Sequence, residues 1–306
     1  MFRLAHLSDP HIGPLPDLRM RDLASKRMLG YVNWRRNRAS RLTSVPLEQL
    51  MDDLADHPPD HIAVTGDITN LALDAEIAAA AEWLAALGKP RDVSVVPGNH
   101  DAYVPGAVAK LRRAWGAFMR GDDQVGHEAA SPFPFVRKRG PVAIVGVSSA
   151  RASGPFFATG HFGPSQSVDL ADRLHALGQE GYFRVVLIHH PPKRGSTSWH
   201  KRLVGGSRFR SAIQGAGAEL ILHGHTHDPD RTTIPGRDGA VPVIGVPSAS
   251  AGFSDKHPPA RYNLFSISGT PGAWRCELTE RGLDPATRGI HDLSTTPVAC
   301  PGSVAA

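Results

Sequence analysis

The stretch V-V-P-G-N-H-D at residues 95–101 begins as an apolar run and ends in reactive side chains. Its first residues are typical of a buried strand, and the proline and glycine indicate a sharp turn directly after it. A turn does not account for Asn99, His100 and Asp101, whose amide, imidazole and carboxylate groups bind metals or transfer protons. Ligands of an α/β sheet collect outside the carboxyl ends of its strands. This stretch therefore predicts a strand that delivers functional groups to a site.

Short apolar runs of this kind recur along the chain and alternate with helical patterns. Buried strands are predicted at 2–7, 61–65, 93–96, 142–147, 184–188 and 219–222. Helices are predicted at 46–55, 74–87, 169–177 and 207–215. Such alternation is typical of an α/β fold with a buried sheet. Three later strands, at 241–246, 262–267 and 274–278, suggest that a second sheet is completed late in the chain.

The 306 residues are enough for a substantial core, and no linker or repeat divides them. We therefore expect one domain over residues 1–283, with a long insert at about 14–45. Residues 284–306 are rich in Pro, Gly, Ser, Thr and Ala and show little periodicity. They predict a loosely ordered C-terminal tail.

Charge and cysteine content narrow the class of protein. The formal net charge of +5 and the pI near 9.5 favour anionic partners without choosing among them. The two cysteines, Cys276 and Cys300, form no disulfide framework. The N-terminus lacks the pattern of a signal peptide, and no run approaches the roughly 18 apolar residues of a membrane span. These features predict a cytoplasmic protein.

Reactive side chains follow five of the predicted strands. Taken singly, each cluster has an ordinary explanation as a turn, a helix cap or a surface histidine. Five such accidents at five strand ends are implausible together, so the sequence predicts one shared metal site. The clusters are Asp9 and His11; Asp67; Asn99, His100 and Asp101; His189 and His190; and His223, His225 and His227.

The ligand types indicate which metals and which chemistry to expect. Carboxylate, amide and imidazole groups without thiolate suit divalent ions such as Mn²⁺, Fe²⁺ or Zn²⁺. Two such ions about 3.5–4 Å apart form the clamp that enzymes use for phosphoryl transfer. A hydroxide bridging the two ions would then be the nucleophile.

The blocks D-P-H, G-D, G-N-H-D, H-H-P-P and G-H-T-H, in this order, resemble the signature of the calcineurin-like metallophosphoesterase family. The resemblance spans residues 9–227, and no block is missing. It implies a four-layer α/β/β/α sandwich with a two-metal centre at the strand ends. It also implies a metal-dependent hydrolase of phosphoester bonds.

The resemblance assigns a role to each matching residue. By motif, the first metal would be held by Asp9, His11 and His227, and the second by Asn99, His189 and His225. Asp67 would bridge the two ions. His100 would be the catalytic acid beside the substrate, with Asp101 as its orienting partner. His190 and His223 fall outside the ligand positions and are expected to have structural roles.

The substrate stays open at this stage. The insert interleaves basic residues with apolar and aromatic ones, which suits a helical cap, an active-site flap, or a contact with a membrane surface through residues 26–41. Nucleic acid is a weaker alternative, because no recognised module is visible. Trp34, Arg35 and Arg151 are candidate substrate contacts.

Two substrate classes are in reach. The first is a phosphodiester of the cyclic-nucleotide type. The second is a nucleotide-sugar lipid pyrophosphate of the UDP-diacylglucosamine type, which would be hydrolysed at the inner membrane face. A phosphomonoester also remains open, and a non-catalytic metal-binding scaffold is the alternative from another class. The oligomeric state is not readable from the sequence.

Overall fold

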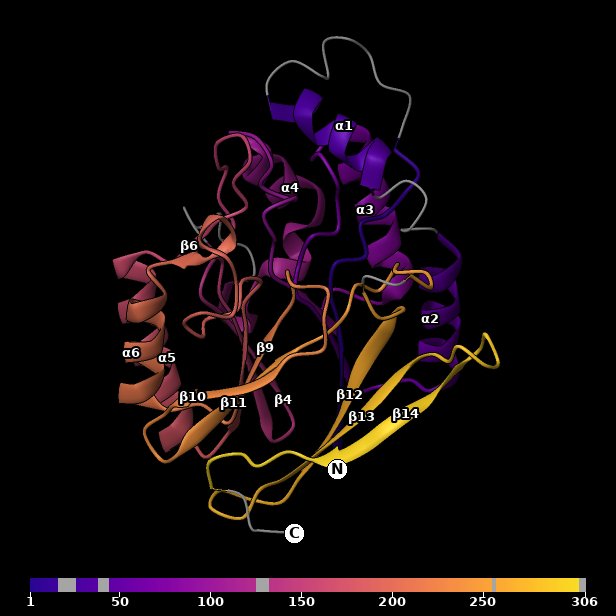
Figure 1. Ribbon diagram of the computed structural model, residues 1–306. Helices are drawn as coiled ribbons and strands as arrows, with labels where there is room; N and C mark the ends of the chain where they lie inside the picture. The colour runs from indigo at the N-terminus through magenta and orange to yellow at the C-terminus, as the bar shows by residue number, and fades with distance from the viewer. Residues whose placement is uncertain (16–25, 38–43, 125–131, 255–256, 303–306) are drawn as a thin grey trace.

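The computed structural model describes residues 1–15, 26–37, 44–124, 132–254 and 257–302, without the side chains of residues 33 and 35–37. Two six-stranded sheets form its centre. Helices cover the outer faces of both sheets (Figure 1). Among the described residues, no helix combines the length and apolar character that a bilayer span requires.

The first sheet joins the start of the chain to its end. Its strand order is β14-β13-β12-β1-β2-β3. β1, β2 and β3 are parallel, whereas β12, β13 and β14 are antiparallel to their neighbours. The strands are β1 (Phe2–Leu7), β2 (His61–Val64), β3 (Val93–Val95), β12 (Arg261–Ser268), β13 (Arg275–Leu283) and β14 (Ile290–Pro297).

The second sheet has the order β10-β11-β9-β7-β5-β4. Its four central strands are parallel, and β4 and β10 run antiparallel at the two edges. The strands are β4 (Phe135–Arg139), β5 (Val142–Gly146), β7 (Phe183–Leu187), β9 (Leu220–His223), β10 (Arg231–Pro235) and β11 (Ala240–Gly245). Two short strands, β6 (Gly160–His161) and β8 (Leu203–Val204), pair in parallel as a separate two-stranded sheet.

Helices pack on one face of each sheet. α2 (Ser44–Asp56), α3 (Asp74–Leu87) and α4 (Ala107–Trp115) contribute apolar side chains to a core against the first sheet. α5 (Pro164–Gln179) and α6 (Gly206–Ala216) do the same against the second sheet. α1 (Lys26–Asn37) lies at the end of the molecule opposite the two termini (Figure 1). Single turns of 3₁₀-helix occur at η2 (Gly116–Met119), η3 (Asp122–Gln124) and η4 (Trp199–Lys201).

The alternation of side chains along each strand produces the layers. On β1, Leu4 enters the core between the sheets, whereas Ala5 enters the core under α2 and α3. On β5, Ile144 faces the other sheet and Val145 faces α5 and α6. Successive side chains of a strand point to opposite faces, so a strand that is buried on both faces must be apolar throughout. The predicted four-layer α/β/β/α sandwich is confirmed.

The end of the chain is more ordered than its composition predicts. Residues 290–297 form β14, which pairs antiparallel with β13 from Leu283↔Ile290 to Glu277↔Pro297. The expectation of a loose tail from residue 284 onward is therefore corrected, although residues 303–306 lie outside the described part. The physical reason is that β14 is an edge strand with mostly solvent-facing side chains, so pairing with β13 supplies backbone hydrogen bonds without an apolar pattern.

Candidate metal centre

The loops after β1, β2 and β9 have an unusual backbone. Positive φ angles occur at Asp9 (52°), His11 (39°), Asp67 (53°), His225 (73°) and His227 (60°). Residues other than glycine rarely adopt such angles, which cost about 1–3 kcal/mol each and cluster at functional sites. Tight loops of this kind turn the side chains of neighbouring residues into one space.

The loops also hold one another by backbone contacts. The Asp9 N–H donates to the Gly66 carbonyl at 2.9 Å, and the His11 N–H donates to the Asp67 carbonyl at 3.1 Å. A Cβ atom on Gly66 would lie 2.5 Å from the amide nitrogen of Gly98, so only glycine fits there. The ends of β1, β2 and β3 are therefore in close backbone contact with each other.

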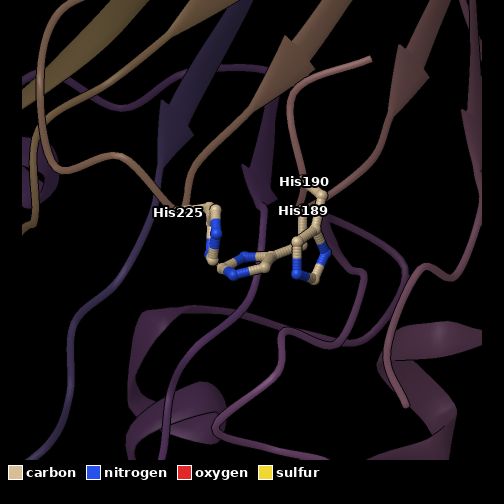
Figure 2. Close-up of side chains that lie close together, drawn as sticks. All are labelled: His189, His190 and His225. Atoms are coloured by element: carbon tan, nitrogen blue, oxygen red, sulfur yellow. The ribbon is translucent and has the colours of Figure 1, made fainter. Parts of the chain in front are cut away.

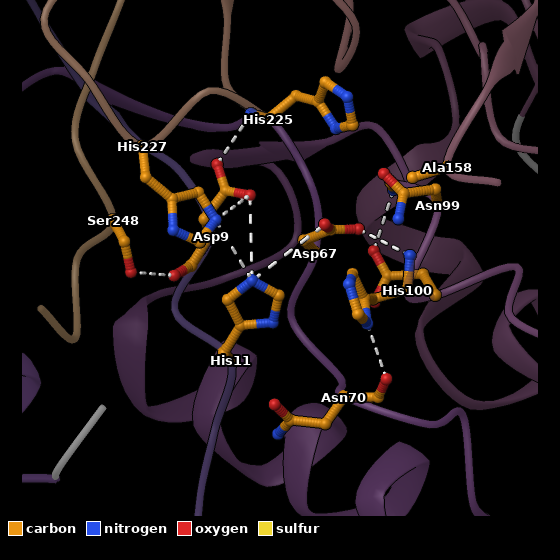
Figure 3. A network of polar contacts seen from close by, with 12 residues as sticks. Asp9, His11, Asp67, Asn70, Asn99, His100, Ala158, His225, His227 and Ser248 are labelled. Carbon is orange, nitrogen blue, oxygen red and sulfur yellow. Dashed lines mark hydrogen bonds and ion pairs between the residues drawn. The ribbon is translucent and has the colours of Figure 1, made fainter. Parts of the chain in front are cut away.

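The first cluster consists of Asp9, His11 and His227 (Figure 3). Asp9 Oδ1 lies 3.2 Å from His227 Nε2 and 3.8 Å from His11 Nε2, and the two Nε2 atoms are 3.3 Å apart. The Nδ1–H of His11 donates to the Thr69 carbonyl at 3.2 Å, which leaves its Nε2 lone pair directed into the cluster. Asp9 Oδ1 is buried and accepts no hydrogen bond from the described residues. Converging lone pairs and a buried carboxylate oxygen fit a bound cation.

The second cluster is formed by His189, Asn99 and His225. His189 donates its Nδ1–H to the Thr65 carbonyl at 2.6 Å, so its Nε2 faces Asn99 Oδ1 at 3.3 Å. His225 donates its Nε2–H to the Lys201 carbonyl at 3.0 Å, which leaves Nδ1 as its ligand atom. The rings of His189 and His225 lie 5.1 Å apart. This set, with imidazole tautomers fixed by outer hydrogen bonds, can hold a second ion.

Asp67 lies between the two clusters (Figure 3). Its Oδ2 is 3.4 Å from His189 Nε2 and 4.0 Å from His11 Nε2. Its Oδ1 accepts the backbone N–H of His100 at 2.7 Å. One carboxylate thus faces both clusters and fixes the loop after β3 as well.

The buried charges of the pocket shift the pKa values of these groups in different directions. Burial raises the pKa of Asp67, but His189 and His100 outweigh it and hold that pKa well below its usual range. Asp9 behaves in the same way, with His227 as its main partner, and its pKa is lowered. Burial lowers the pKa of His225 well below its usual value. Burial also opposes protonation of His189, yet the nearby carboxylates of Asp67 and Asp9 raise its pKa to about 9. The carboxylates are therefore anionic, and they hold a positive charge on His189 where a metal cation would substitute.

His190 lies beside the second cluster but is engaged elsewhere (Figure 2). Its ring centroid is 4.3 Å from that of His225, and ligand atoms of His189, His190 and His225 lie within 4.8 Å of one another. Nevertheless, its Nδ1 accepts a hydrogen bond from Ser149 Oγ at 2.8 Å and its Nε2–H donates to the Ala158 carbonyl at 3.1 Å. With both ring nitrogens in use, His190 packs the site rather than offering a ligand atom.

His100 stands at the edge of the first cluster. Its ring packs edge-on against His11 at 4.9 Å and stacks on Tyr103 at 5.5 Å. The Nδ1–H of His100 donates to the Asn70 carbonyl at 2.6 Å. The Asn70 N–H in turn donates to the buried carboxylate of Glu76 at 2.7 Å. Asn70, Glu76 and Tyr103 did not stand out in the sequence, although Glu76 in the first turn of a predicted helix is a known capping signal.

The structure places Asp101 differently from the expected orienting role. Its Oδ1 accepts the N–H and the hydroxyl of Thr69 at 2.9 and 3.1 Å, and its Oδ2 accepts the Gly98 N–H at 2.9 Å. The carboxylate thus joins the loops after β2 and β3. Burial, followed by the charge of Asp67, raises the pKa of Asp101 to about 7.

The remaining predicted residues lie farther out. Arg151 is exposed in the loop after β5. Trp34 stacks on Tyr31 within α1 at 6.4 Å, and the side chain of Arg35 lies outside the described residues. His223 is buried behind the site, where its Nδ1–H donates to the Gly224 carbonyl at 3.0 Å.

Comparisons with solved structures agree with this fold. A crystal structure of a dimetal phosphatase from Danio rerio superposes with a TM-score of 0.63 at 15% identity, covering 92% of this chain and 96% of that one. The purple acid phosphatase PPD1 from yellow lupin gives 0.53 at 12% identity, over 95% of this chain and 52% of that one. At such identities the likeness shows the fold alone. A search of curated proteins finds no significant match.

The family assignment rests on the sequence itself. A family model described as calcineurin-like phosphoesterase matches residues 2–229, about three quarters of the chain. The matched region includes every strand end described above. The chain belongs to the calcineurin-like phosphoesterase family and is a metal-dependent phosphoester hydrolase, and its described residues include groups that could hold metal ions.

Proposed function

We propose that this chain hydrolyses phosphodiester bonds and that Asp67 is the ligand shared by both metal ions. The observation that carries the proposal is the position of Asp67 Oδ2 between His189 Nε2 and His11 Nε2. Asp9, His11 and His227 would hold one ion, and Asn99, His189 and His225 the other. Oxygen and imidazole ligands of this kind favour Mn²⁺, Fe²⁺ or Zn²⁺.

The roles divide between the ions and the protein. When bound, the two cations polarise the phosphoryl group and supply an activated water as nucleophile. His100 lies next to the first cluster, and its Nδ1–H is held by the Asn70 carbonyl. In the imidazolium form, Nδ1–H stays on the Asn70 carbonyl and Nε2–H is the proton available to the leaving oxygen. The proton would pass from Nε2 to that oxygen as the ester bond breaks.

Two substrate classes follow from this chemistry. A soluble phosphodiester of the cyclic-nucleotide type is the first candidate, because His100 supplies a proton to an alkoxide leaving group. A lipid-linked nucleotide-sugar pyrophosphate is the second, and one observation favours it. Large apolar side chains, among them Phe156 and Trp199, are exposed at the end of the molecule that carries the centre.

The first test strips the protein of metal, reloads it with Mn²⁺, Fe²⁺ or Zn²⁺, and measures its turnover of two chromogenic esters. Bis-(p-nitrophenyl) phosphate should be hydrolysed faster than p-nitrophenyl phosphate, and the reverse would indicate a phosphomonoesterase. His100→Ala should keep both metal equivalents and lower kcat about 10²–10⁴-fold. His175→Ala, which removes an exposed histidine of α5, is the matched control and should change neither quantity.

Two results would contradict the proposal. Absence of metal-dependent turnover on both esters, with the metals bound, would indicate a non-catalytic scaffold. Loss of the metals in His100→Ala would show that His100 is a ligand and not an acid.

A further inference from the structure

Large apolar side chains gather at one end of the molecule. Phe156 is 81% exposed, Trp199 is 64% exposed and Met28 is 50% exposed. Single exposed apolar residues are normal on protein surfaces, but a contiguous group marks an interaction site. We call the following six residues the apolar rim: Met28, Leu29, Val32, Phe156, Phe157 and Trp199.

Hydrogen bonds and ring contacts join the segments that carry the rim. Lys26 Nζ, at the start of α1, donates to Ser153 Oγ at 3.0 Å and to the Phe157 carbonyl at 2.9 Å. The ring of Phe157 packs edge-on against that of Trp199 at 5.3 Å. α1, the loop at 153–157 and η4 therefore form one surface, and α1 lies opposite the chain termini (Figure 1).

The same segments touch the metal centre. The Lys201 carbonyl accepts the Nε2–H of His225, and the Ala158 carbonyl accepts the Nε2–H of His190. Lys26 Nζ lies 4.7 Å from the centre of the Tyr103 ring, which stacks on His100. A surface that the rim binds would consequently face the catalytic groups.

The charge of these segments has a single sign. Residues 26–37, 148–162 and 191–210 contain eleven Lys and Arg and no Asp or Glu. Arg151, Lys201 and Arg202 are exposed beside the apolar side chains. Apolar tips next to cations suit the boundary between the head groups and the acyl chains of an anionic bilayer.

We propose that the apolar rim docks this protein on an anionic lipid bilayer and presents the metal centre to lipid-linked phosphoesters. The evidence for docking is the apolar rim and the cations beside it. The choice of substrate rests on the proposed function. A protein partner would need many acidic side chains to match this surface. Nucleic acid would match the cations but would gain little from Met28, Leu29 and Val32, because aliphatic side chains offer no ring on which bases can stack.

The experiment is co-sedimentation of the full chain with phosphatidylglycerol vesicles and with phosphatidylcholine vesicles. Wild type should pellet with the anionic vesicles, and 0.5 M NaCl should weaken binding because it screens charge. Lys201→Glu should lower the partition coefficient about tenfold. Arg275→Glu is the matched control. Arg275 pairs with Ser268 beside the start of β1, at the far end of the strands from the metal centre, and should bind as wild type does.

A second variant tests the contribution of the apolar rim to vesicle binding. Phe156→Asn with Trp199→Ser should reduce binding to anionic vesicles about tenfold or more. Asn is chosen because Phe156 has a φ of 66°, which Asn tolerates well. Urea unfolding of each variant checks that its fold is intact.

The outcomes separate docking from catalysis. Equal loss in Lys201→Glu and Arg275→Glu, or no vesicle binding at all, would overturn the docking proposal. Displacement of the protein from vesicles by a single-stranded oligonucleotide, with the same sensitivity to the rim variants, would assign the surface to nucleic acid instead. Turnover of bis-(p-nitrophenyl) phosphate without vesicle binding refutes only the docking, and vesicle binding without metal-dependent turnover refutes only the proposed function.

Discussion

Replacing Glu76 by glutamine should weaken both the fold and the proton transfer proposed for His100. The Glu76 carboxylate is 5% exposed and receives backbone N–H groups of the loop after β2. Its Oε1 accepts Asn70 N–H at 2.7 Å, and its Oε2 accepts Leu71 and Leu73 N–H at 3.0 Å each. Glutamine keeps one carbonyl oxygen but turns an NH₂ group toward the other donors. With the glutamine oxygen in the place of Oε2, Asn70 N–H loses its acceptor, and the bonds from Leu71 and Leu73 N–H lose the strength that the carboxylate charge gives them.

The size of the effect follows from these bonds. Hydrogen bonds to a charged group contribute about 1.5–3 kcal/mol each. Burial raises the pKa of Glu76, so part of that gain is offset by the cost of keeping the carboxylate ionised. We expect Glu76→Gln to lower the free energy of unfolding by about 2–4 kcal/mol. The Asn70 carbonyl should shift with the loop, and a misplacement of 1 Å at a catalytic group costs about 10²-fold in rate.

The assay combines urea unfolding with steady-state kinetics on bis-(p-nitrophenyl) phosphate. Glu76→Gln should lower kcat about 10–100-fold with KM and metal content unchanged, since no metal ligand is altered. Glu82→Gln on the exposed face of α3 is the matched control and should leave both measurements as in wild type. If the two variants behaved alike, Glu76 would not position His100. If Glu76→Gln lost its metals, the effect would act through the ligands and this reasoning would be wrong.

Three further predictions concern the ligands and the far side of the fold. Asp67→Asn keeps the shape of the side chain but removes its charge, so elemental analysis should find the metal content reduced from about two equivalents to one or fewer, and full retention would argue against a shared ligand. His189→Asn should lose bound metal, whereas His190→Asn should keep it. The free energy of unfolding of His190→Asn should fall by about 1–3 kcal/mol because hydrogen bonds of the ring are lost. The opposite result would exchange the roles of the two histidines. The Asp53 carboxylate accepts hydrogen bonds from Arg281 and Tyr262. Burial alone would raise the pKa of Asp53, but these partners outweigh it and lower that pKa. The carboxylate therefore stabilises the fold above about pH 4, and this contribution is lost as the pH falls through the lowered pKa. Urea unfolding of metal-free protein between pH 7 and pH 3 should therefore show a weaker acid destabilisation in Asp53→Asn than in wild type, and equal slopes would contradict this.

The central strands were predictable from sequence because they are buried on both faces. Each of the six early strands begins and ends within about two residues of its prediction, and the helix at 74–87 agrees at both ends. The two-residue strands β6 and β8 were missed, and so were three longer strands, β4, β10 and β14. All three lie at sheet edges, where one face is solvated and polar side chains such as Arg231 and Thr233 interrupt any apolar run. An edge strand depends on its neighbour for pairing, and that information is absent from its own residues.

At the metal centre, too, some features were predictable from sequence and others were not. The positions that converge were predictable, because five strand ends of one fold carried ligand-type side chains. The hydrogen-bond partners were not, because Asp101 follows His100 in sequence while its carboxylate points to Thr69 and Gly98. In a tight turn, adjacent side chains leave the backbone in different directions, so proximity in sequence does not predict contact.

The loops of the centre are held in place by groups that are not ligands. Positive φ angles at Asp9, His11 and Asp67 disfavour the observed backbone. Asp101 and Glu76 oppose that cost in the loop of Asp67, because Asp101 accepts backbone N–H groups of the loops after β2 and β3 and Glu76 accepts several from the loop after β2. The ligands are consequently directed at one point by hydrogen bonds within the protein. Such preorganisation keeps the Asp67 carboxylate within reach of both clusters, which is the geometry that two-metal hydrolysis requires.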